Sequence, residues 1–362
     1  MRVLQIGSDR SKRGILYPDT PAAKRQAAYG EKFGHLDIVG FSLRDDGRKP
    51  YEISEHTHVY PTNSFSKLFY GLDTIRIIRS LPKPDVISVQ DPFEAGLLGL
   101  LISWWMQVPL HVQVHTDIFS SGYLLHSALN HVRAIVARIV LAHANRIRSV
   151  SHRIQKSIKA QTHAKAAISV LPIFVDIEKF KNATRIPELE ARFAKFTTKL
   201  LVVSRLEPEK NVALAIDSFA QSAPPEACLI IVATGSQQKS LEALVREKNI
   251  SDRIFFEGEH QAIDYYPLAS LVLVTSYYEG YGLVIIEALA ADKPVLSTDV
   301  GIASEMGAII ADQKDFPAAL SAWFEGGPRA MTLKEYPYKN FDDYVQKYCE
   351  DVALSIKVKV RV

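Results

Sequence analysis

Segments typical of buried strands alternate with helical segments along almost the whole chain, and this alternation limits the fold more than any other feature. In the first half, the expected strands are residues 3–6, 36–41, 86–89, 110–114 and 146–150. Segments of helical period lie between them, for example residues 66–80 and 124–142. Strands that alternate with helices form a parallel sheet with crossover helices. The first half is therefore expected to form one Rossmann-like α/β domain.

The same alternation restarts near residue 200. The expected strands of the second half are residues 200–204, 229–233, 254–257, 271–275 and 294–298. Single cores rarely grow beyond about 250 residues, so we expect a second Rossmann-like domain and a ligand crevice between the two. The predicted boundaries are a first domain at 1–172, an interdomain segment at 173–198, a second domain at 199–340 and a C-terminal helix and tail at 341–362. That helix is expected to cross back onto the first domain.

Composition argues against several classes of protein. Cys228 and Cys349 are the only cysteines, and they lack the spacing of a zinc site or a disulfide framework. The first residues are typical of a strand that ends in a glycine turn rather than of a signal peptide. We therefore expect a cytoplasmic protein, since thiols stay reduced there.

The longest apolar segment, residues 95–106, is shorter than the roughly 20 residues that a transmembrane helix needs. One interpretation is a buried helix of an α/β domain. The other is that Trp104 and Trp105 rest at a membrane interface. The sequence leaves both interpretations open.

Charge is distributed unevenly along the chain. Residues 1–175 hold 22 Lys and Arg against 13 Asp and Glu, whereas residues 176–362 hold 21 against 27. No acidic residue lies between Asp117 and Asp176, a segment with eight Lys and Arg. Such a segment is typical of a solvated helical face, but it also suits an anionic membrane surface or a phospholipid-type acceptor. Nucleic acid is a weaker interpretation, because no base-reading fold accompanies the charge.

Several nucleotide and metal motifs are missing from the sequence. It has no G-x-G-x-x-G fingerprint, no G-x-x-x-x-G-K-[ST] loop, no H-E-x-x-H and no Asp-x-Asp pair. A dehydrogenase is therefore disfavoured, and no metal ligands are expected. An Asp-x-Asp pair would hold a metal on the diphosphate of a nucleotide sugar. Without that metal, the charge of a diphosphate has to be neutralised by protein cations and backbone amides.

Two basic residues at the start of the second domain supply such cations. Arg205 and Lys210 follow the strand at 200–204 and precede a helical segment, so they can converge on one anion. Pro208 favours a helix start close by, and a helix N-terminus adds positive potential.

Two carboxylates bracket a glycine loop after a later strand of the same domain. Glu279 follows the strand at 271–275, and Glu287 falls in the first turns of the next helix. Between them, Gly280-Tyr281-Gly282-Leu283 can present amides at a helix N-terminus. Carboxylates accept hydrogen bonds from neutral hydroxyls, so the pattern indicates a phosphorylated sugar.

Together these motifs resemble the family 4 glycosyltransferases of the GT-B fold. The residues that carry the resemblance are Ser204-Arg205-Leu206-x-Pro208-x-Lys210-Asn211, then Tyr278-Glu279-Gly280-Tyr281-Gly282-Leu283 with Glu287-Ala288-Leu289-Ala290, then Lys293-Pro294-Val295, Asp299-Val300-Gly301 and Ser304-Glu305. Upstream, Val112-Gln113-Val114-His115-Thr116-Asp117 is similar to the family strand that ends in a site histidine. The first loop departs from the family pattern, since Gly14 stands there without a second glycine.

The resemblance implies a nucleotide-diphosphate sugar as donor, bound without metal or cofactor. By that resemblance Arg205 and Lys210 stabilise the diphosphate, and the amides of Gly280, Tyr281, Gly282 and Leu283 complete its cradle. Glu287 is expected to accept hydrogen bonds from the ribose, and Glu279 from the donor sugar.

The first domain is implied to contribute His115 and the loop that ends at Gly14. His115 is expected to approach the sugar at the reacting centre, and residues 9–14 to cover the phosphates. Arg205, Lys210, Glu279 and His115 are thus the candidate catalytic residues. The family retains the anomeric configuration, and no covalent nucleophile is evident, so we expect front-face attack by the acceptor.

The expected function is transfer of a sugar to an acceptor hydroxyl in polysaccharide, lipid-linked glycan or glycolipid synthesis. The basic segment 118–175 suits a lipid-linked or saccharide acceptor at the cytoplasmic face of a membrane, with the enzyme bound peripherally. Two alternatives remain: a GT-B sugar-nucleotide epimerase, and a non-catalytic sugar-nucleotide-binding protein. The donor base, the sugar and the oligomeric state are not encoded in any motif.

Overall fold

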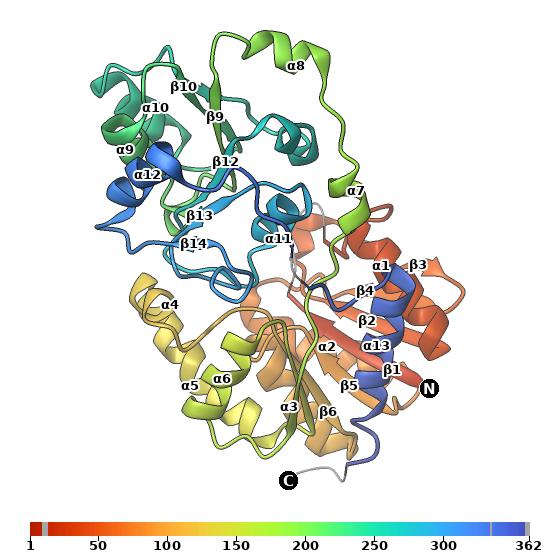
Figure 1. Ribbon diagram of the computed structural model, residues 1–362. Coiled ribbons are helices and arrows are strands. Elements are labelled where there is room, and N and C mark those ends of the chain that lie inside the picture. Colours follow the sequence, from red (N-terminus) through yellow and green to blue (C-terminus); the bar gives the residue numbers. More distant parts are fainter. Residues whose placement is uncertain (9–13, 334, 359–362) are drawn as a thin grey trace. The chain divides into compact units, whose positions relative to one another are not determined.

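The computed structural model describes residues 1–8, 14–333 and 335–358 of the chain. It divides into two compact units, each with its own sheet (Figure 1). The first unit is Met1–Pro172 with Tyr338–Val362, and the second is Ile173–Pro337. Within the described residues, no helix is both long and apolar enough to cross a membrane.

The first unit contains an eight-stranded sheet in the order β3-β4-β2-β1-β5-β6-β7-β8. All neighbours pair in parallel except β3 and β4. The bounds are β1 Arg2–Gly7, β2 His35–Gly40, β3 Tyr51–Ser54, β4 Thr57–Pro61, β5 Val86–Val89, β6 Leu110–Val114, β7 Arg146–Ser149 and β8 Ala167–Val170. The five predicted strands are present. The sequence analysis missed β3, β4 and β8, which are short and only partly apolar.

Seven α-helices accompany this sheet in the described residues. They are α1 Pro21–Phe33, α2 Tyr70–Arg79, α3 Glu94–Met106, α4 Ser121–His126, α5 Ala128–His143, α6 His152–Gln161 and α13 Phe341–Ala353. The single helix predicted at 124–142 is wrong, because Ser127 divides it: its side chain caps α5 by accepting from the amide of Leu129. Gly99 brings α3 close to the sheet, since a Cβ there would lie 2.4 Å from Val89 Cγ1.

The C-terminal helix α13 packs on the first unit, as predicted. The hydroxyls of Tyr29 and Tyr344 lie 2.6 Å apart. Asp351 pairs with Arg146 and lies 3.2 Å from Nε2 of His111 on β6. Polar side chains on one face of this sheet are therefore satisfied by a helix more than 200 residues later in the sequence.

The second unit contains a six-stranded parallel sheet in the order β11-β10-β9-β12-β13-β14. The strands are β9 Thr198–Val203, β10 Ala227–Val232, β11 Ile254–Phe256, β12 Leu271–Val274, β13 Val295–Ser297 and β14 Ile309–Ile310. The helices are α7 Ile177–Lys181, α8 Pro187–Arg192, α9 Val212–Ser222, α10 Gln238–Glu247, α11 Leu283–Ala290 and α12 Phe316–Gly326. The five predicted strands are all present; the two-residue β14 was not predicted.

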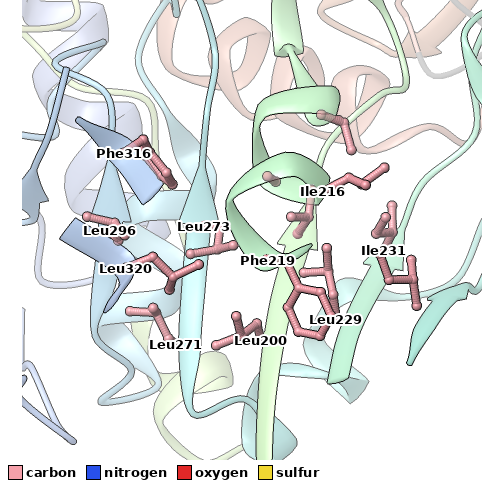
Figure 2. Close-up of a cluster of buried hydrophobic side chains, with 14 of the residues drawn as sticks. Leu200, Ile216, Phe219, Leu229, Ile231, Leu271, Leu273, Leu296, Phe316 and Leu320 are labelled. Carbon is pink, nitrogen blue, oxygen red and sulfur yellow. The ribbon is translucent and has the colours of Figure 1, made fainter. Parts of the chain in front are cut away.

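An apolar core holds this sheet against its helices (Figure 2). Ile216 and Phe219 of α9 lie over Leu200, Leu229 and Ile231 of the sheet. Phe316 and Leu320 of α12 extend the same core to β12 and β13. The core fixes the strands whose carboxyl ends carry the candidate site.

Candidate active site

Two neighbouring strands of the second unit bring the predicted residues to one edge of the sheet. β9 and β12 are parallel, with Leu200 opposite Leu271. Their carboxyl ends therefore lie at the same edge, where ligands bind in open α/β sheets. Arg205 follows β9, and Glu279 lies in the loop after β12.

Lys210 and Glu279 form an ion pair at the centre of this edge. Lys210 Nζ lies 2.7 Å from Glu279 Oε1, and each side chain is only 15% exposed. Ser276 Oγ donates to the same carboxylate oxygen at 2.7 Å, while Thr275 Oγ1 donates to the carbonyl of Lys210 at 3.2 Å. The loop after β12 thus fixes both partners of the pair.

Arg205 pairs with a residue that the sequence analysis did not single out. Arg205 Nη2 lies 2.7 Å from Glu209 Oε1, and its side chain is 69% exposed. The amide of Tyr277 donates to the carbonyl of Glu209 at 2.9 Å, which ties this turn to the loop after β12. Both candidate cations therefore contact a carboxylate, and an incoming anion has to compete for them.

A helix does begin close to Pro208, as predicted, but a 3₁₀ turn comes before it. Pro208–Lys210 form a 3₁₀ turn, and α9 begins only at Val212. Asn211 between them has φ +47°, a left-handed conformation that asparagine tolerates better than most residues. This reversal separates the Lys210 side chain from the helix.

The glycine loop leads directly into α11. Gly282 precedes the helix with φ +89°, which favours glycine. At Gly301, a Cβ would lie 2.5 Å from the carbonyl oxygen of Tyr281, and the amide of Ile302 donates to that oxygen at 3.1 Å. The segment after β13 therefore holds the loop in position at the helix N-terminus, where amides favour anions.

Glu287 lies on α11 and is held by a tyrosine. Its Oε2 accepts a hydrogen bond from the Tyr266 hydroxyl at 2.7 Å. Burial raises the pKa of Glu287 above its ordinary value, and the hydrogen bond from Tyr266 partly opposes that rise. No motif in the sequence pointed to Tyr266, which comes from a 3₁₀ turn at Tyr266–Leu268.

Two further features of this edge were not predicted. The hydroxyl of Ser204, next to Arg205, is buried and has no hydrogen-bond partner among the residues that the structure describes. Glu207 accepts from the Ser236 amide at 3.1 Å and from its hydroxyl at 2.6 Å, which joins the loops after β9 and β10. An unsatisfied buried hydroxyl is a group that a bound ligand can complete.

His115 and Gly14 belong to the first unit. His115 follows β6 and is half-buried; burial, assisted by Arg148, Arg25 and His111, lowers its pKa to about 3. Its imidazole is therefore neutral at physiological pH. The carbonyl of Gly14 accepts from the Thr20 hydroxyl at 3.2 Å. Residues 9–13 of the predicted phosphate loop lie outside the described residues.

A separate cluster in the first unit joins His35, Asp37 and His58. The carboxylate of Asp37 is 3.0 Å from Arg2 Nη1 and 3.1 Å from His35 Nε2. Adjacent strands β2 and β4 place the two histidine rings 5.0 Å apart. The arrangement is a hydrogen-bonded network around one buried carboxylate, remote in sequence from the candidate active site.

Two family profiles match consecutive parts of the chain. The profile described as Glycosyltransferase Family 4 matches residues 27–179, and the one described as Glycosyl transferases group 1 matches residues 189–316. The second profile contains every candidate residue of the second unit.

Curated relatives match over part of their length. The lipopolysaccharide core biosynthesis mannosyltransferase LpsB of Rhizobium meliloti is 34% identical over 34% of this chain and 41% of its own. The putative teichuronic acid biosynthesis glycosyltransferase TuaC of Bacillus subtilis is 29% identical over 62% and 55%, respectively. The alpha-monoglucosyldiacylglycerol synthase of Streptococcus pneumoniae is 23% identical over 59% and 51%. The chain thus spans about half the length of these relatives.

Solved structures match over nearly the whole chain. HepE of Anabaena, in complex with UDP, gives a TM-score of 0.70 at 18% identity and covers 99% of this chain and 98% of its own. The sucrose-phosphate synthase of Thermosynechococcus elongatus gives 0.74 at 19% identity, with the same coverage. Likeness at this identity shows the fold, and it confirms the GT-B prediction.

Proposed function

We propose that this chain, which belongs to the family 4 glycosyltransferases, moves a sugar from a nucleotide-diphosphate sugar to an acceptor hydroxyl with retention of configuration. The observation that carries the proposal is the pair of Lys210 and Glu279, 2.7 Å apart beside the N-terminus of α11. A diphosphate needs the cation and the amides, and a sugar needs the carboxylate.

Donor binding is proposed to open the Lys210–Glu279 and Arg205–Glu209 ion pairs. The diphosphate takes Lys210 and Arg205 from Glu279 and Glu209, and the amides around Gly282 hold its remaining oxygens. Glu279, released from Lys210, then accepts hydrogen bonds from the sugar hydroxyls. As the bond to the leaving phosphate breaks, negative charge grows on the diphosphate, so both cations stabilise the transition state more than the ground state.

The nucleoside is proposed to lie along α11. The Tyr266 hydroxyl holds one carboxylate oxygen of Glu287, which leaves the other oxygen to accept from the ribose. The unpaired Ser204 hydroxyl is available to the diphosphate beside Arg205. These contacts need no metal ion, so donor binding is proposed to resist a chelator.

His115 is the proposed contribution of the first unit to the reaction. With its pKa lowered to about 3, the imidazole stays neutral and donates or accepts a hydrogen bond without adding charge. The acceptor oxygen attacks from the side of the leaving phosphate, and a phosphate oxygen takes the acceptor proton. The new glycosidic bond then forms on the face from which the nucleotide departs.

The acceptor is proposed to be a lipid-linked or saccharide hydroxyl at the cytoplasmic face of a membrane. The relatives support this class by their names: one is a lipopolysaccharide core mannosyltransferase, one is a putative teichuronic acid glycosyltransferase, and one is an alpha-monoglucosyldiacylglycerol synthase. The basic segment 118–175 supports an anionic acceptor or surface.

Product analysis tests this function. Purified enzyme is incubated with nucleotide sugars, with and without a membrane-lipid extract, and the products are followed by NMR and mass spectrometry. Nucleotide diphosphate release that depends on the extract, with a retained anomeric centre, supports the proposal. Conversion of one nucleotide sugar into another without acceptor identifies an epimerase instead, and donor binding without turnover identifies a non-catalytic protein.

A further inference from the structure

Three helical segments of the first unit expose apolar side chains. Twelve of the eighteen large hydrophobic residues exposed in the described structure lie there: Phe65, Leu68, Phe69, Leu72, Leu97, Leu101, Trp105, Leu125, Leu129, Val132, Ile135 and Ile139. We call this surface the apolar face. Single exposed hydrophobic residues are ordinary, but a patch of this size marks an interaction site.

Helix α5 carries the clearest stripe. Leu129, Val132, Ile135 and Ile139 recur every three or four residues and are all exposed. The opposite side of the helix, with Ala134, Ala137 and Val140, is buried. A helix that is apolar on both sides normally has protein on both. Here, the described residues leave one side of the helix exposed.

Helices α3 and α2 lie next to this stripe and carry exposed apolar residues of their own. Helix α3 packs against α5 and exposes Leu97, Leu101 and Trp105, each four residues after the last. On α2, the Arg79 guanidinium lies 5.7 Å from the centre of the Trp105 ring. The three segments are therefore neighbours on the first unit.

A groove of about 550 Å³ enters the protein from the apolar face. Leu97 and Leu101 belong to both the face and the groove wall. The groove is also lined by Ser8 and Phe41, which follow β1 and β2. The groove thus runs to the carboxyl ends of the strands, the edge at which α/β sheets bind ligands.

The charges around the apolar face are mainly positive. Residues 65–83, 94–106 and 121–143 contain six Lys and Arg but only two acidic residues. Both acidic residues are already paired: Asp73 with Arg76 at 3.0 Å, and Glu94 with Arg133 at 2.9 Å. Lys67 at the groove is exposed and has no ion pair among the described residues. Exposed apolar side chains flanked by cations suit a surface of anionic lipid.

We propose that the apolar face docks on an anionic bilayer and that the groove takes the hydrocarbon chain of a lipid-linked acceptor. The role of the groove rests on the proposed function, whereas docking of the apolar face on the bilayer does not. A second copy of this chain is a poorer occupant. In a two-fold dimer the same patch meets itself, so two surfaces with excess positive charge would face each other.

Vesicle flotation tests the docking. We expect the protein to float with phosphatidylcholine vesicles that contain phosphatidylglycerol, but poorly with phosphatidylcholine alone, and less at high salt. The double variant Ile135→Ser/Ile139→Ser should lower the partition coefficient at least about tenfold, because two side chains no longer enter the bilayer. The matched control is Ile356→Ser, since Ile356 is 43% exposed against 47% for Ile139 and lies off the face.

The docking is wrong if the wild-type protein does not float with anionic vesicles, or if the double variant floats equally well. Circular dichroism confirms that the variants are folded. Analytical sedimentation tests whether a second copy of the chain covers the face. The proposal is also wrong if the wild-type protein is a dimer that does not bind vesicles and the double variant is a monomer. Flotation needs no donor, so its failure is distinct from failure of the proposed function.

The groove is tested with a fluorescent farnesyl phosphate as probe. A Cβ at Gly71 meets only Leu98 Cδ1, at 3.7 Å, so Gly71→Phe fills the groove without a backbone clash. We expect this variant to weaken probe binding at least about tenfold and to leave both vesicle flotation and stabilisation by nucleotide unchanged. Gly326→Phe is the control, because a Cβ there meets nothing within 4 Å. Unchanged probe binding in Gly71→Phe, or displacement of the probe by inorganic phosphate alone, contradicts the chain-binding groove.

Discussion

The two units differ in where they leave apolar side chains exposed. Among the described residues, the first unit exposes fifteen large hydrophobic residues, most of them on the apolar face, whereas the second exposes only Tyr277, Leu283 and Ile310. Tyr277 lies in the loop between β12 and α11, the loop that also holds Glu279, and Leu283 is the first residue of α11. In both units the exposed apolar residues gather where a partner is proposed: a nucleotide in one and a lipid in the other.

The interiors differ as well. The second unit fills the space between sheet and helices with aliphatic and aromatic side chains (Figure 2). The first unit has apolar residues in its interior as well, but it also buries Arg148, which donates to Gln113 Oε1 at 2.9 Å and to the carbonyl of Leu171 at 3.1 Å. The Tyr348 ring lies 5.0 Å from its guanidinium. Geometry in the first unit therefore depends on a buried cation that the C-terminal helix completes.

The largest expected effect belongs to the second unit. Lys210→Met and Glu279→Gln should each lower kcat by about 100-fold to 1,000-fold while the protein stays folded, because each removes a charge that faces the reacting groups. Steady-state kinetics with the identified donor measures this. The matched controls are Lys314→Met and Glu325→Gln, which replace exposed residues of the same unit. Near-normal kcat in Lys210→Met would remove the basis for the site.

The next effect concerns the first unit. Arg148→Met should lower its free energy of unfolding by about 3 kcal/mol, because it leaves buried hydrogen-bond acceptors unsatisfied. Denaturant unfolding measures the loss, and Arg76→Met, at an arginine whose side chain is 83% exposed, serves as control. Nucleotide binding by the second unit should persist in this variant. If Arg76→Met lowers the free energy of unfolding equally, the buried hydrogen bonds of Arg148 do not account for the loss.

A smaller effect is expected at Glu287. Glu287→Gln should weaken nucleotide binding about tenfold, the cost of one charged hydrogen bond. Since burial raises the pKa of Glu287, nucleotide affinity in the wild type should fall with decreasing pH before an ordinary glutamate would protonate. Titration calorimetry across the acidic range measures both. A pH profile that is identical in Glu287→Gln and in wild type would assign the ribose contact elsewhere.

The smallest expected effect is that the His115 imidazole does not titrate near neutral pH. Its pKa is lowered from 6.5 to about 3, so the folded protein keeps it neutral while the unfolded chain takes up a proton below pH 6.5. The neutral histidine therefore costs stability progressively as the pH falls from 6.5 towards 3. NMR of labelled histidine should show no titration of His115 between about pH 5 and 8. A midpoint near 6.5 would contradict its burial beside Arg148.

Sequence reasoning predicted that Lys210 and Glu279 lie at one edge of the second sheet, because both belong to short motifs at strand ends. Because β9 and β12 are parallel neighbours, the loops that carry Lys210 and Glu279 lie at the same edge of the sheet. It missed Glu209 and Tyr266, because nothing local shows which carboxylate a surface arginine selects or which hydroxyl reaches Glu287. It also missed the exposure of the α5 stripe. Periodicity identifies two apolar sides of that helix but cannot say which one the sheet covers.

Thermal unfolding in the presence of UDP, GDP or ADP, with and without EDTA, tests the central claim most directly. A nucleotide at about 100 times its dissociation constant should stabilise the protein by roughly 2.7 kcal/mol. The account predicts that one nucleotide does so, that EDTA does not change the shift, and that Lys210→Met abolishes it while Lys314→Met keeps it. No shift with any nucleotide, or a full shift in Lys210→Met, would contradict a donor site built on Lys210 and Glu279.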